Sequence, residues 1–104
     1  MQREVLKGHL DLLLLAAVAD EPAHGYRLVE LLKERSGGAF ELAEGTVYPA
    51  LYRLERQGLL TSAWSTVGGR RRRIYRLTRR GQGELEARRG EWTRFVGAMQ
   101  AVLA

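Results

Sequence analysis

The sequence has no cysteine in its 104 residues. This absence excludes disulfide bonds, zinc sites built on thiolates and cysteine nucleophiles. Histidine is nearly as scarce: His9 and His24 are the only two, and neither has a carboxylate at ligand spacing. We therefore expect no metal site and no cofactor. The lack of cysteine fits a reducing compartment, and we expect a cytoplasmic protein.

Long apolar runs are also missing. The most apolar stretch, residues 12–19, is shorter than the roughly 18 to 20 residues that span a bilayer. Basic residues precede it, as in a signal peptide, but Asp11 interrupts the run and acidic residues follow it. The pattern predicts a buried core helix and no association with a membrane.

A catalytic constellation is missing as well. No nucleophile, base and orienting group can be assembled from the sequence. Gly81 and Gly83 form only a GxG fragment that follows no parallel strand, which is not a nucleotide-binding fingerprint. We predict that the protein is not an enzyme.

The last absence is local. Between Arg56 and Gly83 there is no aspartate or glutamate, and this stretch contains eight arginines. The stretch carries +8 and the whole chain +5, so the remaining residues sum to −3. Such a local concentration of positive charge indicates a polyanionic partner.

Periodicity and end signals predict a mostly α-helical fold with one small β-hairpin. Leucine spacing indicates helices over about 7–19, 25–35 and 46–57. Short β-prone runs over 60–66 and 72–77 are separated by Gly68 and Gly69, which predicts a hairpin. Thr78 is the expected N-cap of a long last helix that reaches nearly to Ala104.

Three helices followed by a two-stranded hairpin are typical of a winged helix-turn-helix. In this fold the third helix enters the DNA major groove, and the hairpin, or wing, lies along the backbone or in the minor groove. Arginine suits both positions, because its planar guanidinium donates two parallel hydrogen bonds. We therefore predict a partner of double-stranded DNA, although an arginine run can also be a solvated patch. Trp64, in the first strand, is expected to be a packing residue.

Three segments, HGYRLVELL, GTVYPALYRLERQGLL and GGRRRRIYRLTRRG, resemble the PadR family of bacterial transcriptional regulators in order and spacing. The resemblance covers residues 6–104, and the chain's length is similar to the short subgroup with a single C-terminal dimerisation helix. It implies a winged-helix homodimer that represses transcription at an operator and is released by a small molecule. The positions that match the family's DNA-binding residues are Gly25, Tyr26, Thr46, Tyr48, Pro49, Tyr52, Arg53, Gly69, Arg70, Arg71, Arg72 and Arg73.

The residues also predict dimerisation without the resemblance. A last helix of about 25 residues with an apolar stripe has too little of its own chain to pack against. We expect residues 1–78 to form the DNA-binding domain and residues 79–104 to form a dimerisation helix that packs with the first helix of the partner. Two recognition helices one DNA turn apart then predict a pseudo-palindromic operator. The expected interface residues are Leu85, Trp92, Phe95, Met99, Val102 and Leu103.

Trp92 has two interpretations. A lone aromatic residue on such a stripe usually fills a dimer core. The segment GEWTRFV also resembles PadR-like regulators whose tryptophan faces its symmetry mate and stacks on planar aromatic compounds, which implies an aromatic effector. The candidate lining residues are Val5, Leu12, Ala16, Trp92, Phe95 and Val96.

Two alternatives to a DNA-binding regulator remain. Winged helices also serve as protein-interaction modules without operator binding, but a scaffold has no need of four arginines at residues 70–73. An RNA-binding domain is the other alternative. It is disfavoured because the chain lacks the exposed aromatic residues of a four-stranded RNA-binding sheet.

Overall fold

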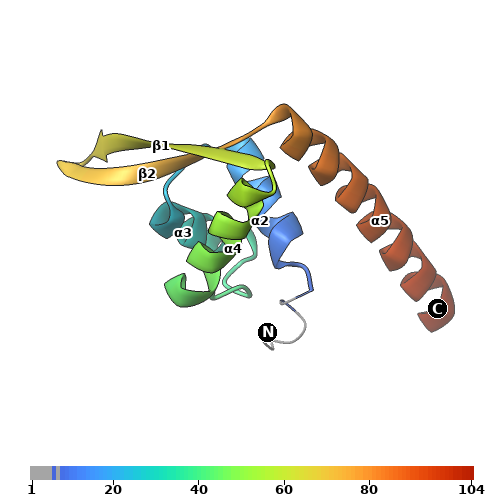
Figure 1. The fold of residues 1–104 in the computed structure, drawn as a ribbon. Helices are drawn as coiled ribbons and strands as arrows, with labels where there is room; N and C mark the ends of the chain where they lie inside the picture. Colours follow the sequence, from blue (N-terminus) through green and yellow to red (C-terminus); the bar gives the residue numbers. More distant parts are fainter. Residues whose placement is uncertain (1–5, 7) are drawn as a thin grey trace.

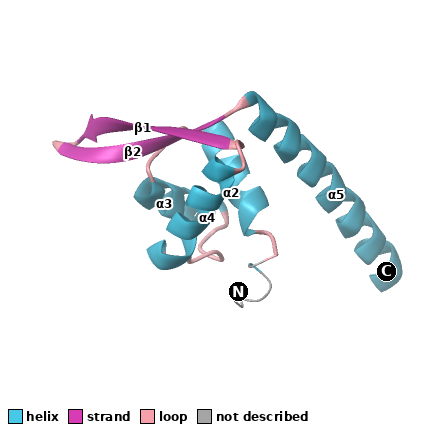
Figure 2. Cartoon of the chain, in the orientation of Figure 1, coloured by secondary structure: helices cyan, strands magenta, loops and turns pink. Residues whose placement is uncertain are grey.

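The computed structural model describes residue 6 and residues 8–104. In this part of the chain, helices and one antiparallel hairpin follow each other in the predicted order (Figures 1 and 2). The elements are α2 (Leu10–Asp20), α3 (Gly25–Arg35), α4 (Glu44–Arg56), β1 (Leu60–Val67), β2 (Arg70–Leu77) and α5 (Arg79–Leu103). The predicted bounds hold to within about three residues, and the fold class is confirmed.

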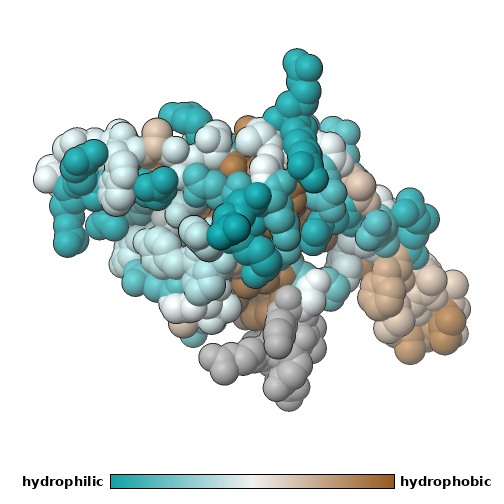
Figure 3. Space-filling view, viewed as in Figure 1, coloured by the Kyte–Doolittle hydropathy of each residue, from teal (hydrophilic) through white to brown (hydrophobic). Residues whose placement is uncertain are grey.

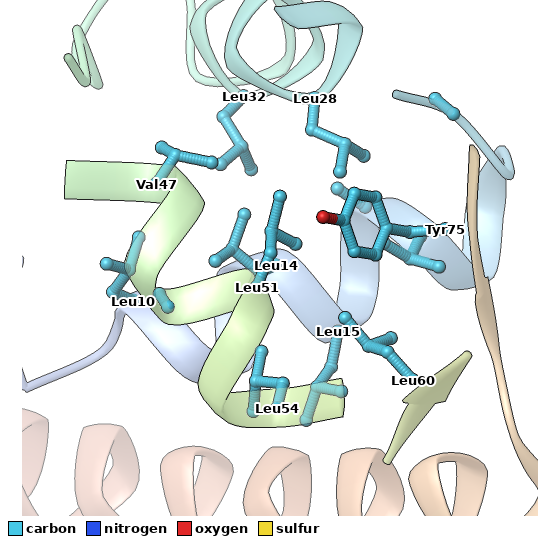
Figure 4. Close-up of a cluster of buried hydrophobic side chains, with 14 of the residues drawn as sticks. Leu10, Leu14, Leu15, Leu28, Leu32, Val47, Leu51, Leu54, Leu60 and Tyr75 are labelled. Atoms are coloured by element: carbon cyan, nitrogen blue, oxygen red, sulfur yellow. The ribbon is translucent and has the colours of Figure 1, made fainter. Parts of the chain in front are cut away.

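The core lies where α2, α3 and α4 meet the base of the hairpin. Leu14, Leu28, Leu51 and Leu54 are fully enclosed there, one or two from each helix. Figure 4 shows these side chains converging, with the ring of Tyr75 entering from β2 and its hydroxyl pointing into the cluster. Burial of the ring raises the pKa of Tyr75. The hairpin is therefore anchored in the core by one aromatic side chain.

The hairpin extends far beyond the core. Its strands pair in register from Leu60 opposite Leu77 to Val67 opposite Arg70. Gly68 and Gly69 close it at φ 57° and 79°, and two successive positive φ angles are typical of a type I′ hairpin turn. Figure 1 shows the distal half of the hairpin projecting past α3 and α4, as a wing does.

Thr78 connects the hairpin to α5 as the predicted N-cap. Its hydroxyl accepts the Gly81 N–H at 2.9 Å and donates to the Gly58 carbonyl at 2.7 Å. A Cβ atom on Gly81 would lie 2.0 Å from the Leu59 carbonyl oxygen, so only glycine permits this close approach. These contacts set the direction in which α5 leaves the wing.

Helix α5 diverges from the body of the molecule, and its C-terminal end projects alone (Figure 1). Figure 3 shows a brown, apolar surface at this end of the helix. Val102 is 82% exposed, and Trp92, Phe95 and Met99 are also exposed. Leu85 is different: it is 1% exposed and belongs to the core of its own protomer. The prediction that Leu85 faces a partner is therefore wrong, because the first turns of α5 complete the core.

Candidate nucleic-acid interface

Helix α4 presents a face without contacts to the core. Val47, Ala50, Leu51 and Leu54 point inward, which leaves the opposite side of the helix to solvent. Tyr52 is 61% exposed and stands near the middle of this outer face. The other exposed side chains on it are Tyr48, Pro49, Arg53 and Arg56. Tyrosine and arginine side chains of this kind can donate hydrogen bonds to base edges and phosphates.

Two of these residues are held by neighbouring helices. A Cβ atom on Gly25 of α3 would lie 2.5 Å from a ring carbon of Tyr48. Only glycine at this position therefore leaves room for the tyrosine ring. Gly25 is itself buried, which corrects its assignment as a DNA contact: its role is packing. On the other side of α4, Arg53 donates a hydrogen bond to Asp11 of α2.

Pro49 lies deeper in α4 than expected, because the helix begins at Glu44 rather than near Thr46. It occupies the sixth helical position, where its missing N–H leaves the Gly45 carbonyl without its usual partner. Both Gly45 and Pro49 are exposed, whereas Thr46 is partly buried. The carbonyl can therefore reach solvent or a ligand on the outer face of α4.

The N-terminus of α3 is tied to the wing. Ala23 and Tyr75 exchange backbone hydrogen bonds of 3.3 and 2.9 Å, as a short bridge beside β2. This bridge places His24 and Tyr26 next to the wing, and the Arg72 guanidinium lies 5.9 Å from the Tyr26 ring centre. Burial and the nearby Arg72 charge lower the pKa of His24.

The wing carries the predicted arginines together with an aromatic residue whose exposure was not predicted. Arg70 and Arg71 are exposed near the tip, and Arg72 and Arg73 are partly buried closer to the body. Trp64 is 56% exposed, so the prediction that it is a packing residue is wrong. The alternation of inward and outward side chains along β1 does not predict this exposure. The sequence does not show at which residue the hairpin extends beyond the core.

A cleft of about 270 Å³ lies between the wing and the helices. His24 and Tyr48 line one side of it, and the wing lines the other. The wing residues at the cleft are Trp64, Arg71, Arg72, Arg73 and Tyr75. None of these lining residues is acidic, so the cleft is suited to an anion. Of the lining residues, His24, Trp64 and Tyr75 were absent from the predicted interface.

A second groove, of about 260 Å³, lies between the start of α2 and α5. Trp92 borders it, with its ring centre 4.9 Å from that of His9 and 5.9 Å from that of Phe95. Of the other predicted lining residues, Leu12 and Phe95 line the groove, whereas Ala16 and Val96 are outside its lining. Val5, the remaining predicted residue, lies outside the described residues. The remaining lining residues, Gly8, His9, Arg88 and Glu91, were not predicted.

Neither a metal site nor a membrane span is found in the part of the chain that the structure describes. No three histidine, aspartate or glutamate side chains gather there as metal ligands would. No described helix combines the length and the apolar character needed to cross a bilayer.

Comparison with known proteins points to one family. Residues 14–87 match the family described as Transcriptional regulator PadR-like family. A curated protein, Transcriptional regulator Rv3488 from Mycobacterium tuberculosis, is 40% identical over 83 residues, which are 80% of this chain and 75% of that protein.

Solved structures of similar proteins share the whole fold. A PadR family transcriptional regulator from Eggerthella lenta superposes with a TM-score of 0.83 and 34% identity, covering 96% of this chain and 86% of that one. A PadR family regulator from Clostridium difficile gives a TM-score of 0.80 and 32% identity, with 92% and 99% of the two chains covered. The likeness includes the wing and extends over almost the entire chain.

Proposed function

This chain belongs to the PadR-like family of transcriptional regulators, and from that premise we propose that it is a homodimeric repressor that binds a pseudo-palindromic operator. Its family makes it a DNA-binding regulator of transcription and not an enzyme. We propose further that a small-molecule effector releases the protein from its operator.

The observation that carries the proposal is the joint position of α4 and the wing. Tyr52 and Arg56 are exposed on the outer face of α4. Three wing arginines, at 71–73, line one cleft together with Tyr48 of α4. The division of labour follows from the chemistry. Side chains on α4 contact base edges and specify the sequence, and wing arginines contact phosphates and add affinity for any duplex. Tyr26 and Gly69 lie beside them and are expected to contact the backbone.

Dimerisation is supported by the exposed stripe on α5. Phe95, Met99, Val102 and Leu103 are large apolar residues on one side of a helix that projects from the body. An exposed stripe of this kind is stabilised when a second copy covers it. A two-fold symmetric dimer would place two α4 helices about 34 Å apart, which is one turn of DNA.

The groove beside Trp92 supports a planar aromatic effector. The indole is exposed on one side and lies next to His9 and Phe95. Because Trp92 is partly exposed and lies on the same side of α5 as the apolar stripe, a second copy that covers the stripe could enclose a flat ligand between the two tryptophans. The opposing interpretation, in which Trp92 simply fills the dimer core, predicts no ligand.

The proposal is tested by selecting bound fragments from fragmented genomic DNA and measuring their affinity at several salt concentrations. The selected sites should contain two inverted half-sites one turn apart. The logarithm of the binding constant should fall against the logarithm of salt concentration with a slope of about −0.9 per phosphate contacted. Absence of any binding, or a flat salt response, would favour the protein-interaction module instead.

A paired variant separates the wing from a general charge effect. Replacing Arg71 and Arg72 by alanine should weaken binding to all duplexes and reduce the salt slope by about 1.8. Replacing Lys33 and Arg35 by alanine removes the same charge from the far end of α3, where they pair with Glu41 and Asp20. This control should leave the slope almost unchanged.

Addition of a planar dye should then release the DNA if the effector proposal is correct.

A further inference from the structure

Trp64 occupies an unusual position for a large apolar side chain. In the hairpin register it stands opposite Arg73, on the strand face that it shares with Tyr75 two residues further along β2. Tyr75 is buried at the base of this face, but Trp64 lies beyond the core and is more than half exposed. Packing within the protomer therefore does not account for the indole.

Two guanidinium groups flank the indole. The Cζ atoms of Arg71 and Arg73 each lie 5.3 Å from the centre of its ring. Arg73 is held further by a 2.7 Å hydrogen bond to the Ser62 hydroxyl, which donates to Glu55 at 2.7 Å. The tryptophan thus keeps two flexible cations in place before any ligand arrives, which lowers the entropic cost of binding.

The opposite wall of the cleft supplies more donors. The Nδ1 atom of His24 accepts the Arg27 N–H at 3.1 Å, so the ring proton of the neutral imidazole is on Nε2. Tyr48 contributes its phenol from α4, and Arg72 lies beside Tyr26. The residues that line the cleft therefore carry arginine N–H groups, a phenol O–H and an imidazole N–H, together with one apolar aromatic face.

The position of the cleft identifies the ligand. It separates α4, which enters the major groove in the function proposed above, from the wing, which lies in or near the minor groove. The strand that divides these grooves must then pass through the cleft. We propose that the cleft binds the sugar-phosphate backbone of that single DNA strand, with the Trp64 ring against a deoxyribose and the surrounding donors on the adjacent phosphate.

The two kinds of contact match the two kinds of surface. A deoxyribose presents C–H groups, which pack on an aromatic face, whereas a phosphate oxygen accepts hydrogen bonds from guanidinium and imidazole N–H groups. The cleft is near the lower limit of small-ligand sites, about 300 Å³, so it admits one backbone segment but no base pair. Trp64 is therefore a residue that positions the wing on the duplex rather than a reader of bases.

The chain's two tryptophans allow a direct test. Trp92→Phe leaves Trp64 as the only indole, and this variant and the parent protein are titrated in parallel with a fluorescein-labelled duplex of mixed sequence at low salt. Trp64 emission should change with the same midpoint as the anisotropy of the label, and added salt should reverse both signals. DNA binding by anisotropy with unchanged Trp64 emission would overturn the cleft proposal but leave the proposed function intact. Absence of DNA binding by the parent protein, which keeps both tryptophans, would overturn both.

Variants at position 64 test the aromatic face itself. Trp64→Leu keeps an apolar side chain but removes the π face, and DNA affinity should fall about 3- to 10-fold. Trp64→Phe should restore most of that loss. Ser65→Ala, on the other face of the same strand, should bind as the parent protein does. Thermal unfolding checks that each variant is folded, and equal affinity of the folded Leu and Phe variants would overturn the proposal.

Discussion

Arg53 of α4 donates a hydrogen bond to Asp11 of α2, across 42 residues of sequence. The other oxygen of Asp11 lies 3.7 Å from Arg88 of α5, which also lines the groove beside Trp92. One carboxylate therefore connects the proposed DNA-reading helix to the helix that borders the proposed effector groove. The connection is electrostatic and partly exposed, so its strength should depend on salt.

Replacing Asp11 by asparagine tests this connection. The change frees Arg53 from its anionic partner and should raise affinity for non-specific duplex DNA, because one more guanidinium can contact phosphate. The salt slope should steepen by up to about 0.9. The cost in stability should be only about 0–1 kcal/mol, because the Arg53 side chain is half exposed and Asp11 keeps partial contact with solvent. Anisotropy titrations at several salt concentrations measure both effects.

Asp20→Asn is the matched control for that experiment. Asp20 is also on α2, and its carboxylate pairs with Arg35, at 3.0 Å, instead of with α4. Both substitutions remove one negative charge from the same helix, so they change the net charge equally. If the two variants gain DNA affinity to the same extent, net charge explains the effect and the Asp11–Arg53 contact does not.

The junction at Gly81 predicts opposite effects for two glycines in one helix. Gly81→Ala would place a methyl group 2.0 Å from the Leu59 carbonyl oxygen, and should cost about 1–3 kcal/mol or more. Gly83→Ala meets nothing within 4 Å and should stabilise the protein by about 0.5–1 kcal/mol. Urea unfolding measures both values. Similar effects at the two positions would contradict the close approach of α5 to Leu59.

His24 predicts a pH dependence of stability. Burial, followed by the Arg72 charge, lowers the pKa of His24 in the folded state. The unfolded chain then binds more protons between the folded pKa and about 6.5, so stability should fall as the pH drops through that window. Asn at this position keeps an N-cap acceptor but does not titrate. The unfolding free energy of the parent minus that of His24→Asn should become smaller or more negative from pH 7.5 to 5.5. A constant value of this difference would refute the prediction.

The α5 stripe predicts that dimerisation and folding can be separated. Met99→Asp places a charge in the exposed stripe and should raise the dimer dissociation constant about tenfold or more. Ala101→Asp introduces the same charge on the opposite side of the helix and should leave the dimer dissociation constant unchanged. Leu85→Ala should instead lower protomer stability by about 2–5 kcal/mol, because Leu85 is buried in the core. Sedimentation measures the dimer dissociation constants of the Met99 and Ala101 variants. Denaturant unfolding measures the stability of the Leu85 variant. A dimeric Met99 variant would refute the interface.

Local patterns in the sequence were sufficient to predict the helices and the two strands. Leucine spacing, the two glycines of the hairpin turn and the Thr78 cap all act within a few residues of the chain, so they predicted the helices, the wing and its arginines. The outward side of α4 followed from helical period alone. The errors at Gly25, Trp64 and Leu85 concern residues whose surroundings come from distant segments: α4 over Gly25, the end of the core below Trp64, and the core around Leu85.

By itself, the sequence determined the order of the elements, the family and the concentration of positive charge, because these depend on residue type and short-range spacing. Only the tertiary structure decided which side chains share a surface. The Ala23–Tyr75 bridge brings His24 beside the wing, and the Asp11 carboxylate reaches both Arg53 and Arg88. Such contacts join residues tens of positions apart, and their formation depends on how the helices and the hairpin pack around one core.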